Sequence, residues 1–570
     1  MIISRRTALL GGMVGGVGAC ATKPQLGSFQ NAGAGGEDTF ACGVASGDPR
    51  PDSVVLWTRV HGVSEGQVPV TVVIAEDESF SRMVWRGKAE AGPQTDYCVK
   101  VVADRLEPGK SYAYKFLVFD RESPVGFTKT LPLEAESARF AIASCTNYQY
   151  GFFNAYDHIA RQEGLDAVLH LGDYLYEYGP DGYGGDVGAA IGRLHEPAKE
   201  IVVLDDYRQR HRQYKADPAS QRMHAKHPLI AIWDDHETSN DSWKDGAENH
   251  QPETEGPWAE RKRAAMQAYY EYMPVREPVP GRTREEIWRD YGWGKYLTVT
   301  AIESRLTART KPIGYEQAAP MLAEDGGADR YRAEVLNDPE RRLLGAEQMD
   351  YVMGSLKRSV DTGAEWRLIA NQILFARVSL PALSEYVGEA EIAAIEPLFP
   401  EIRDFMAYTS AGLPYNTDSW DGYPVERERF YEASATAGAS DLVVLTGDTH
   451  QFWANDLKRD DGTHMGVELG TAGITSPGPA GLFGDKAFDF SLLMRRDNPE
   501  VRYTDAINNG YLLLSFEEDR GRVDFITMST VRSPNYTATR GASFDLVKKN
   551  GTVEFAKPKG LGFKERVLYR

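Results

Sequence analysis

Five short apolar runs in this chain each end in side chains that can bind a metal ion. The runs cover residues 140–144, 168–172, 229–233, 368–370 and 442–447. They are followed by Cys145, Asp173, the sequence Asp234-Asp235-His236-Glu237, Asn371, and the sequence Asp448-Thr449-His450. Ligand sites in α/β sheets form outside the carboxyl ends of strands, so these endings are expected to meet at one edge. One such ending alone is weak evidence for a site, because Asp and Asn are common turn residues after a strand. Five endings in chain order indicate one site.

Several of the segments between these runs have the residue spacing of helices. Helical spacing is found at 152–161, in much of 198–226, at 343–359 and at 426–437, and further strand runs at 511–516 and 523–528. Strands that alternate with helices predict an α/β fold. The stretch 240–290 is polar and rich in proline, and we expect an insertion on the side of the site rather than core.

Residues 38–132 have a different pattern and are predicted to form an all-β domain. Short β-prone runs, such as 53–58, 70–74 and 112–116, are separated by turn residues. The stretch 106–112 looks like the turn before a late strand of a fibronectin-type or immunoglobulin-like sandwich. Cys42 and Cys98 lie here; a disulfide is possible in an exported chain, but we expect two buried thiols.

Composition limits the class of protein and its partners. The chain has 570 residues, a net charge of −19 and 42% hydrophobic residues, which indicates about two to four globular domains. The negative charge argues against nucleic acid as a stable partner. It does not exclude a phosphate-bearing substrate, because a metal ion can reverse the field locally. Four cysteines exclude a disulfide scaffold, and no apolar run reaches the about 18 residues of a transmembrane helix.

The first 20 residues have the layout of a secretory signal. Arg5 and Arg6 precede a weakly apolar run of small residues, and this pair resembles a twin-arginine signal, which implies the twin-arginine export machinery as a partner. The run ends in Val17-Gly18-Ala19-Cys20, which resembles a lipobox. Lipidated Cys20 would attach the protein to a membrane; ordinary cleavage with Cys20 incidental is the alternative. Residues 21–37 are expected to be a flexible linker, and the protein to lie in the periplasm or on the outer cell surface.

The order of the site motifs carries a family resemblance. The chain is similar to calcineurin-like metallophosphoesterases in the order of four motifs: Gly-Asp-x-x-Tyr, Asp-His-Glu, Asn and Gly-Asp-x-His. The spacing from Asp173 to Tyr176 resembles that of their purple acid phosphatase branch. More closely, the chain resembles the PhoD-like alkaline phosphatases. The motifs are Gly43-Val-Ala-Ser-Gly-Asp-Pro49, Trp57-Thr-Arg59, Ala143-Ser-Cys145, Gly172-Asp-Tyr-Leu-Tyr-Glu-Tyr178, Trp233-Asp-Asp-His-Glu237 and Gly447-Asp-Thr-His450.

The resemblance implies both a fold and a domain order. The fold is a four-layer α-β-β-α metallophosphoesterase sandwich, preceded by an all-β fibronectin- or immunoglobulin-like domain. The expected boundaries are 1–20 for the signal, 21–37 for the linker, 38–132 for the β-sandwich, 133–545 for the metallophosphoesterase domain and 546–570 for a C-terminal tail.

The resemblance also implies a metal centre. Its ligands would be Cys145, Asp173, Tyr176, Asp235, Asn371, Asp448 and His450. Asp173 would bridge two metals, and Cys145, Tyr176 and His450 would hold an iron-type ion. In many relatives Asn stands at the position of Asp235, and His at those of Asn371 and Asp448.

The residue types make independent chemical sense. A phenolate and a thiolate both need deprotonation, which Fe³⁺ enforces. The other predicted ligands offer mainly oxygen atoms, which favours one or two divalent ions other than Zn²⁺. Ca²⁺ is expected first, with Mn²⁺ or Mg²⁺ as alternatives. Such a metal pair lowers the pKa of bound water, and the resulting hydroxide attacks phosphorus. His236 is the candidate donor to the departing alkoxide, or a transition-state stabiliser.

Other polar candidates are weaker. Arg305 can contact substrate phosphate, but Glu303 departs from the Asp expected in the family, and a buried pair with an acidic partner is favoured. His170 lies inside an apolar strand and is expected to be a core residue. The histidines of polar helical stretches are expected to be solvated or structural: His195, His211, His224 and His227.

The function predicted on these grounds is metal-dependent hydrolysis of phosphate mono- or diesters, small-molecule or lipid, outside the cytoplasm. A phospholipase D-like or nuclease-like diesterase is the alternative enzyme. A non-catalytic surface adhesion protein with a structural metal centre is the alternative from another class.

Overall fold

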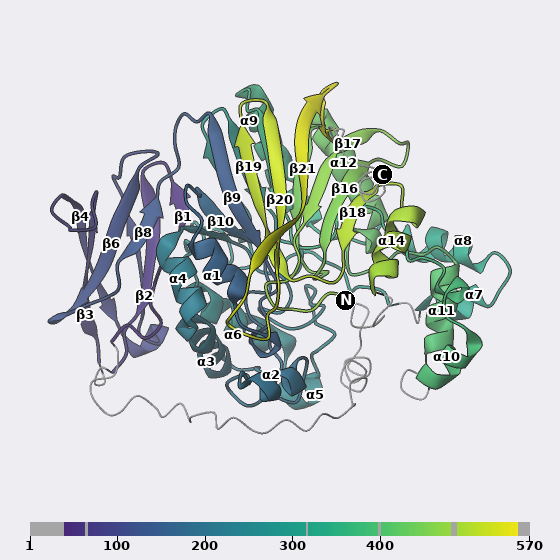
Figure 1. The fold of residues 1–570 in the computed structure, drawn as a ribbon, viewed down its shortest axis with the longest axis horizontal. Coiled ribbons are helices and arrows are strands. Elements are labelled where there is room, and N and C mark those ends of the chain that lie inside the picture. Colours follow the sequence, from purple (N-terminus) through teal and green to yellow (C-terminus); the bar gives the residue numbers. More distant parts are fainter. Residues whose placement is uncertain (1–38, 63–65, 315–316, 397–400, 480–486, 557–570) are drawn as a thin grey trace.

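The computed structural model describes residues 39–62, 66–314, 317–396, 401–479 and 487–556. Two β-sheets pack face to face, and helices cover their outer faces (Figure 1). This is the predicted four-layer α-β-β-α arrangement, and the all-β region precedes it as expected. No helix in the described ranges is long and apolar enough to span a membrane.

The first sheet has ten strands. They are β1 (Val44–Arg50), β2 (Ser53–Arg59), β5 (Cys98–Ala103), β9 (Ser137–Ala143), β10 (Ala167–His170), β11 (Leu229–Ala231), β19 (Gly510–Glu517), β20 (Arg520–Met528), β21 (Ala538–Lys549) and β22 (Thr552–Phe555). Their order is β22-β21-β20-β19-β9-β10-β11-β1-β2-β5. The second sheet has the order β12-β13-β14-β15-β17-β16-β18. Its strands are β12 (Arg289–Trp293), β13 (Leu297–Ala301), β14 (Trp366–Ala370), β15 (Leu442–Thr446), β16 (Phe452–Lys458), β17 (His464–Gly470) and β18 (Val501–Asp505).

The core explains why the central strands are continuously apolar. Along β9, Phe140 and Ile142 pack between the two sheets, whereas Ala141 and Ala143 pack against the helices. Successive side chains of a strand point to opposite faces, so a strand buried on both faces is apolar at every position.

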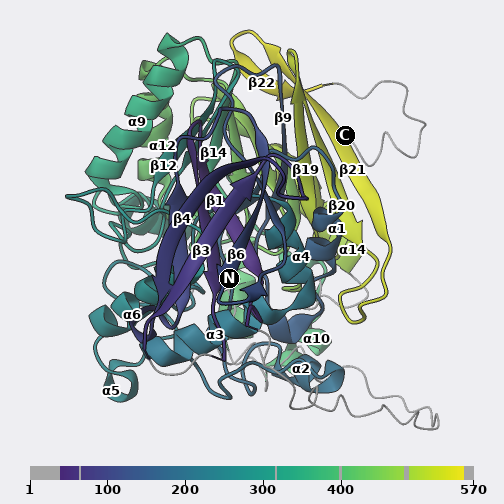
Figure 2. The ribbon, with the colours of Figure 1, turned by 90° about the vertical axis from the view of Figure 1, so that its left-hand side faces the viewer.

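Helices cover each sheet from outside. Beside the ten-stranded sheet lie α1 (Asn154–Ala160), α2 (Gly185–Ile191), α3 (Leu204–Ala216), α4 (Pro218–Lys226), α5 (Pro252–Glu255) and α6 (Trp258–Tyr272). Beside the seven-stranded sheet lie α9 (Gly345–Asp361), α12 (Pro424–Thr436) and α14 (Ala487–Asp497). Viewed from the sandwich end, α9 and α12 lie on one side of the sheets and α1 and α4 on the other (Figure 2). A lobe at the far end contains α7 (Ala319–Leu322), α8 (Gly327–Tyr331), α10 (Glu389–Ile395) and α11 (Ile402–Ser410) (Figure 1).

The N-terminal sandwich shares a sheet with the rest of the molecule. Its separate sheet contains β3 (Val68–Ala75), β4 (Met83–Ala91), β6 (Ser111–Val118), β7 (Arg121–Glu122) and β8 (Gly126–Lys129). The facing layer is β1, β2 and β5, which continue the ten-stranded sheet because Gly47 pairs in parallel with Leu229. Hydrogen bonding is therefore continuous across the expected boundary at residue 132.

Two local predictions need correction, and a third is narrowed to one of its two alternatives. The stretch 240–290 is not only an insertion, because α6 buries Met266 and Tyr269 in the layer between helices and sheet. The expected domain end at 545 lies inside β21, and β22 follows it in the sheet. The histidines described as solvated or structural are structural: His195, His211, His224 and His227 are all buried. His211 on α3 stacks on Tyr272 of α6, and His224 on α4 contacts the Tyr174 hydroxyl. His195 and His227 lie outside the helices, in the segments after α2 and α4.

The predictions for other buried groups are confirmed. Cys42 and Cys98 are free, buried thiols. His170 is fully buried, and its Nε2 lies 2.7 Å from the Tyr156 hydroxyl. The signal, the linker and Cys20 lie outside the described residues.

Candidate metal centre

The predicted strand endings converge at the carboxyl edge of both sheets. β9, β10 and β11 are parallel neighbours, as are β14 and β15. The loops after them are joined by backbone hydrogen bonds, from Thr146 N to Asp173 O (2.8 Å) and from Gly447 N to Gln372 O (2.7 Å). A third backbone hydrogen bond, from Ile474 N after β17 to Ser144 O after β9 (2.9 Å), joins the loops of the two sheets, so both sheets present their loops to one shared region.

Four of the predicted ligands have left-handed backbone conformations. Cys145, Asp173, Asp448 and His450 have φ values of 59°, 53°, 60° and 58°. Such conformations are unfavourable for residues with a Cβ and concentrate at functional sites, where the surrounding fold maintains them. Gly172 shows how tight the turn is, because a Cβ there would lie 2.4 Å from Asp234 N.

One group of side chains could hold a thiolate- and phenolate-bound ion. Ligand atoms of Cys145, Asp173 and His450 all lie within 4.8 Å of one another. The Tyr176 hydroxyl donates to Asp173 Oδ2 (3.1 Å) and lies 3.0 Å from His450 Nε2. His450 Nδ1 donates to Pro477 O (3.1 Å), which leaves Nε2 as the electron-pair donor that a metal needs.

A second group shares Asp173 with the first. Ligand atoms of Asp173, Asp235 and His236 lie within 4.8 Å of one another. Asp173 Oδ1 and Asp235 Oδ1 are buried and have no hydrogen-bond partner in the described part of the chain. A buried carboxylate oxygen without a partner is costly, so both atoms fit a role as cation ligands.

A third group was not predicted from the sequence. It consists of Asp235, Asp241 and Asp418, again with ligand atoms within 4.8 Å of one another. Asp241 lies in the polar stretch that follows β11, and Asp418 in a loop after α11 that has no strand signal. The spacing of neither residue marks it as a ligand.

The electrostatics of the site also fit bound cations. Burial, with the carboxylates of Asp235 and Asp234, raises the pKa of Asp173 well above its usual range, although His236 opposes this. Burial, with Asp418 and Asp235, raises the pKa of Asp241 to about 7. Burial and the charge of Asp173 likewise raise the pKa values of Cys145 and Tyr176. A strongly charged ion is what would deprotonate these groups and offset their repulsion.

His236 is held by a carboxylate that the sequence analysis did not single out. Its Nδ1 donates to Glu177 Oε2 (2.7 Å), and its ring lies 4.0 Å from that of Tyr176. Glu177 Oε1 also accepts from Asn240 N (2.9 Å) and Asn249 Nδ2 (2.8 Å). Glu177 directly follows Tyr176, but only the fold brings it to residue 236.

Arg305 is buried among carboxylates. It is fully buried, pairs with Asp234 and Asp418, and its Nη2 donates to Asp448 Oδ1 (3.2 Å). Burial alone would lower the pKa of Arg305, but these carboxylates raise it well above its ordinary value. This is the buried ion pair that the sequence favoured, and a role in substrate binding stays a prediction.

The remaining two predicted ligands make other contacts. Asp448 Oδ2 accepts from Asn416 Nδ2 (3.4 Å), so both of its oxygens have partners. Asn371 Oδ1 accepts from Trp420 Nε1 (3.2 Å), and its amide donates to Ile373 O. The structure thus brings together six of the predicted site residues: Cys145, Asp173, Tyr176, Asp235, His236 and His450. Asp448 is connected to this set through Arg305, and Asn371 contacts Trp420 instead.

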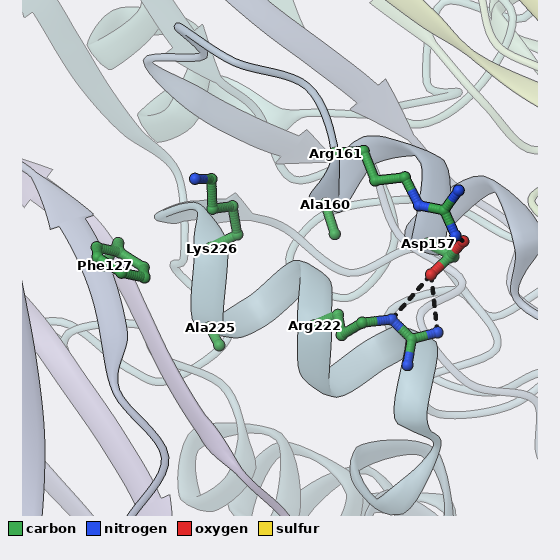
Figure 3. A pocket seen from close by; sticks show the side chains of 7 residues that line it. All are labelled: Phe127, Asp157, Ala160, Arg161, Arg222, Ala225 and Lys226. Carbon is green, nitrogen blue, oxygen red and sulfur yellow. Dashed lines mark hydrogen bonds and ion pairs between the residues drawn. The ribbon is translucent and has the colours of Figure 1, made fainter.

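A surface groove of about 450 Å³ lies elsewhere, between the C-terminal ends of α1 and α4 and strand β8. In Figure 3, Arg222 points toward Asp157, and Lys226 faces Phe127 across the groove. Asp157 pairs with both Arg161 and Arg222, which neutralises much of the positive charge. The groove shares no residue with the metal groups.

Comparisons with known proteins cover both halves of the chain. The family described as PhoD-like phosphatase matches residues 140–525, and the family described as PhoD-like phosphatase, N-terminal domain, matches residues 26–132. The chain is 34% identical over 520 residues to alkaline phosphatase D of Bacillus subtilis (strain 168), which covers 89% of this chain and 80% of that protein. A solved structure of PhoD is similar with a TM-score of 0.73 and 31% identity, over 93% of this chain and 95% of the solved chain.

Proposed function

The chain belongs to the PhoD-like phosphatase family and is a phosphoric ester hydrolase, and we propose that it uses cations bound by the groups of side chains that contain Asp173 and Asp235. The observation that supports this most directly is that Asp173 belongs to two groups and has a buried oxygen without a partner among the described residues. A carboxylate in that position can bridge two ions. The non-catalytic adhesion alternative is set aside, because the family consists of hydrolases.

The chain's own ligands would be divided by chemistry. Cys145, Tyr176 and His450 would hold an ion of high charge, for which Fe³⁺ is the proposed identity. Asp235, with Asp241 and Asp418 beside it, offers oxygen atoms only, which suits Ca²⁺ first and Mn²⁺ or Mg²⁺ next. Bound cations would lower the pKa of water and neutralise phosphoryl oxygens.

His236 would transfer a proton to the leaving alcohol. Its Nδ1 is engaged by Glu177, so Nε2 is the atom available to substrate, and 6% of the side chain is exposed. Stacking on Tyr176 restricts rotation of the ring. Positioning of this kind is the main contribution that a protein makes to phosphoryl transfer.

Two assays test the proposal. Elemental analysis of purified protein is expected to find iron plus a divalent ion, and zinc alone would contradict the assignment of Cys145 and Tyr176. Release of p-nitrophenol from mono- and bis-p-nitrophenyl phosphate would decide between alkaline phosphatase and phosphodiesterase activity, including the diesterase alternatives.

We also propose export through the twin-arginine route and attachment through Cys20. The support is the sequence Ser4-Arg5-Arg6 and the small residues before Cys20. Radiolabelled palmitate should enter the full chain and be lost in Cys20→Ala. If the unaltered chain takes up no label, lipidation is refuted.

A further inference from the structure

A strip of half-buried aromatic rings leads from His236 to an exposed arginine. The ring of Tyr178 lies 5.6 Å from that of His236, and the ring of Tyr183 lies 5.9 Å from that of Tyr178. Tyr150 follows at 5.0 Å from Tyr183, and the Arg532 guanidinium lies 4.9 Å from the Tyr150 ring. Tyr178, Tyr183 and Tyr150 are each partly exposed, and Arg532 is exposed.

The strip is fixed to the loops that carry the metal ligands. Tyr183 O accepts hydrogen bonds from Asn147 Nδ2 (3.4 Å) and Gln149 Nε2 (3.3 Å), in the loop that begins with Cys145. Gly184 has φ +90°, and a Cβ there would lie 2.6 Å from the Tyr150 ring. The close packing of these rings therefore depends on a glycine.

The loop with Arg532 is also held in place. Asn154, itself 3% exposed, donates from Nδ2 to Thr530 O (2.7 Å) and Ser533 O (2.9 Å). Phe152 N donates to Val531 O (2.7 Å). The β20–β21 loop is thereby bound to the start of α1.

Arg532 differs from most arginines of this acidic protein. One of its amino groups donates to Tyr150 O, and no carboxylate in the described part of the chain pairs with it. Arg540, on the next strand and 58% exposed, still lies 3.3 Å from Asp524. A guanidinium has five donors and prefers planar or tetrahedral oxyanions, so Arg532 has donors left for an anion.

We propose that Tyr178, Tyr183, Tyr150 and Arg532 form a subsite for the alcohol part of the substrate, and that it takes a nucleotide-like alcohol with a flat ring and a second phosphate. The flat ring would pack against the tyrosines, as bases do on aromatic side chains, and the second phosphate would bind Arg532. This assignment rests on the proposed role of His236, which places the departing alcohol at the start of the strip.

Binding measurements on the metal-loaded enzyme test the subsite without turnover. Inorganic phosphate in excess fills the metal centre. The titrants are the phosphonate analogue of adenosine 5′-monophosphate, which cannot be hydrolysed, adenosine, and the phosphonate analogue of ribose 5-phosphate. We expect the nucleotide analogue to bind tightest, and Arg532→Ala to weaken it about tenfold or more while adenosine binding stays unchanged.

Further variants keep the test falsifiable. Tyr183→Leu should weaken both adenosine ligands at least about fivefold, whereas Arg540→Ala, the matched exposed arginine, should change none. The subsite is refuted if Arg532→Ala leaves nucleotide binding intact. The nucleotide class is refuted if the ribose analogue binds as tightly as the nucleotide analogue. Failure of the proposed hydrolysis is a separate result, because it would appear as absent turnover of both mono- and bis-p-nitrophenyl phosphate by the unaltered enzyme.

Discussion

Replacing Glu177 by Gln tests whether a buried carboxylate orients His236. Glu177 is fully buried and accepts hydrogen bonds from His236 Nδ1, Asn240 N and Asn249 Nδ2. Burial alone would raise the pKa of Glu177, but His236 and these hydrogen bonds lower it, so the residue is a charged acceptor. Gln keeps the volume but offers one acceptor oxygen and an NH₂ group, which leaves at least one donor without a partner.

Two consequences of different size follow. The unsatisfied donor should cost about 1–3 kcal/mol of unfolding free energy. Freed from its acceptor, the His236 ring can rotate, and loss of such a supporting group typically lowers activity about 10- to 100-fold. We expect this loss in kcat for p-nitrophenyl phosphate, with KM and metal content nearly unchanged, because Glu177 is not a proposed ligand.

Glu468 provides the matched control. It is a fully buried glutamate that accepts from Phe375 N (2.6 Å), Ala376 N (3.1 Å) and Asn455 Nδ2 (2.8 Å), in the other half of the core. Burial raises the pKa of Glu468 to about 7, so the two glutamates are both charged acceptors only at higher pH. Measured at about pH 9, Glu468→Gln should therefore cost similar stability without the loss in kcat. The reasoning is refuted if folded Glu177→Gln keeps the kcat of the unaltered enzyme, or if both variants lose kcat equally.

Four further outcomes are expected. Tyr176→Phe should lose about one metal ion per chain by elemental analysis, and full metal content would exclude Tyr176 as a ligand. Removal of metals by a chelator should lower both activity and the melting temperature, and added cations should restore both; an unchanged melting temperature would argue against cations among the buried carboxylates. Arg305→Met should destabilise the fold by about 3–5 kcal/mol in denaturant unfolding, because it leaves buried carboxylates unpaired; a cost below about 1 kcal/mol would contradict this. Burial lowers the pKa of Lys215 from 10.5 to about 7, so its charged form opposes folding below about pH 7, and the penalty fades as pH rises toward 10.5. Lys215→Met should therefore be more stable than the unaltered chain by up to about 5 kcal/mol near or below pH 7 and by nothing near pH 10.5, and equal differences at both pH values would contradict the assignment.

Local patterns were sufficient to predict the layers and much of the site. Strand β9 is apolar at every position because both of its faces are buried, and the residue after each such strand lies at the carboxyl edge. Asp173 was singled out because it directly follows an apolar strand, and Tyr176 because the Gly-Asp-x-x-Tyr motif resembles that of the purple acid phosphatase branch. Cys145 and His450 were found because each closely follows a strand.

Long-range contacts could not be predicted in this way. Glu177 can be recognised as a functional residue only from its contact with His236, and Asp418 only from its position beside Asp235. Both contacts join loops that are distant in the sequence. The sheet that continues from the sandwich into the rest of the molecule was missed for the same reason, because the pairing of Gly47 with Leu229 leaves no local pattern. The histidines of α3 and α4 were described as solvated or structural because polar helices usually face water, yet both are buried, His211 against Tyr272 and His224 against Tyr174.

The central claim is that Asp173 holds the cations that activate phosphate-ester hydrolysis. The most direct test is the rate of p-nitrophenyl phosphate hydrolysis by Asp173→Asn relative to the unaltered enzyme, both purified with metals present. If Asp173 bridges two cations as proposed, its loss should remove several kcal/mol of transition-state stabilisation, which corresponds to a rate at least about a thousandfold lower. Hydrolysis by Asp173→Asn at the rate of the unaltered enzyme would contradict the account.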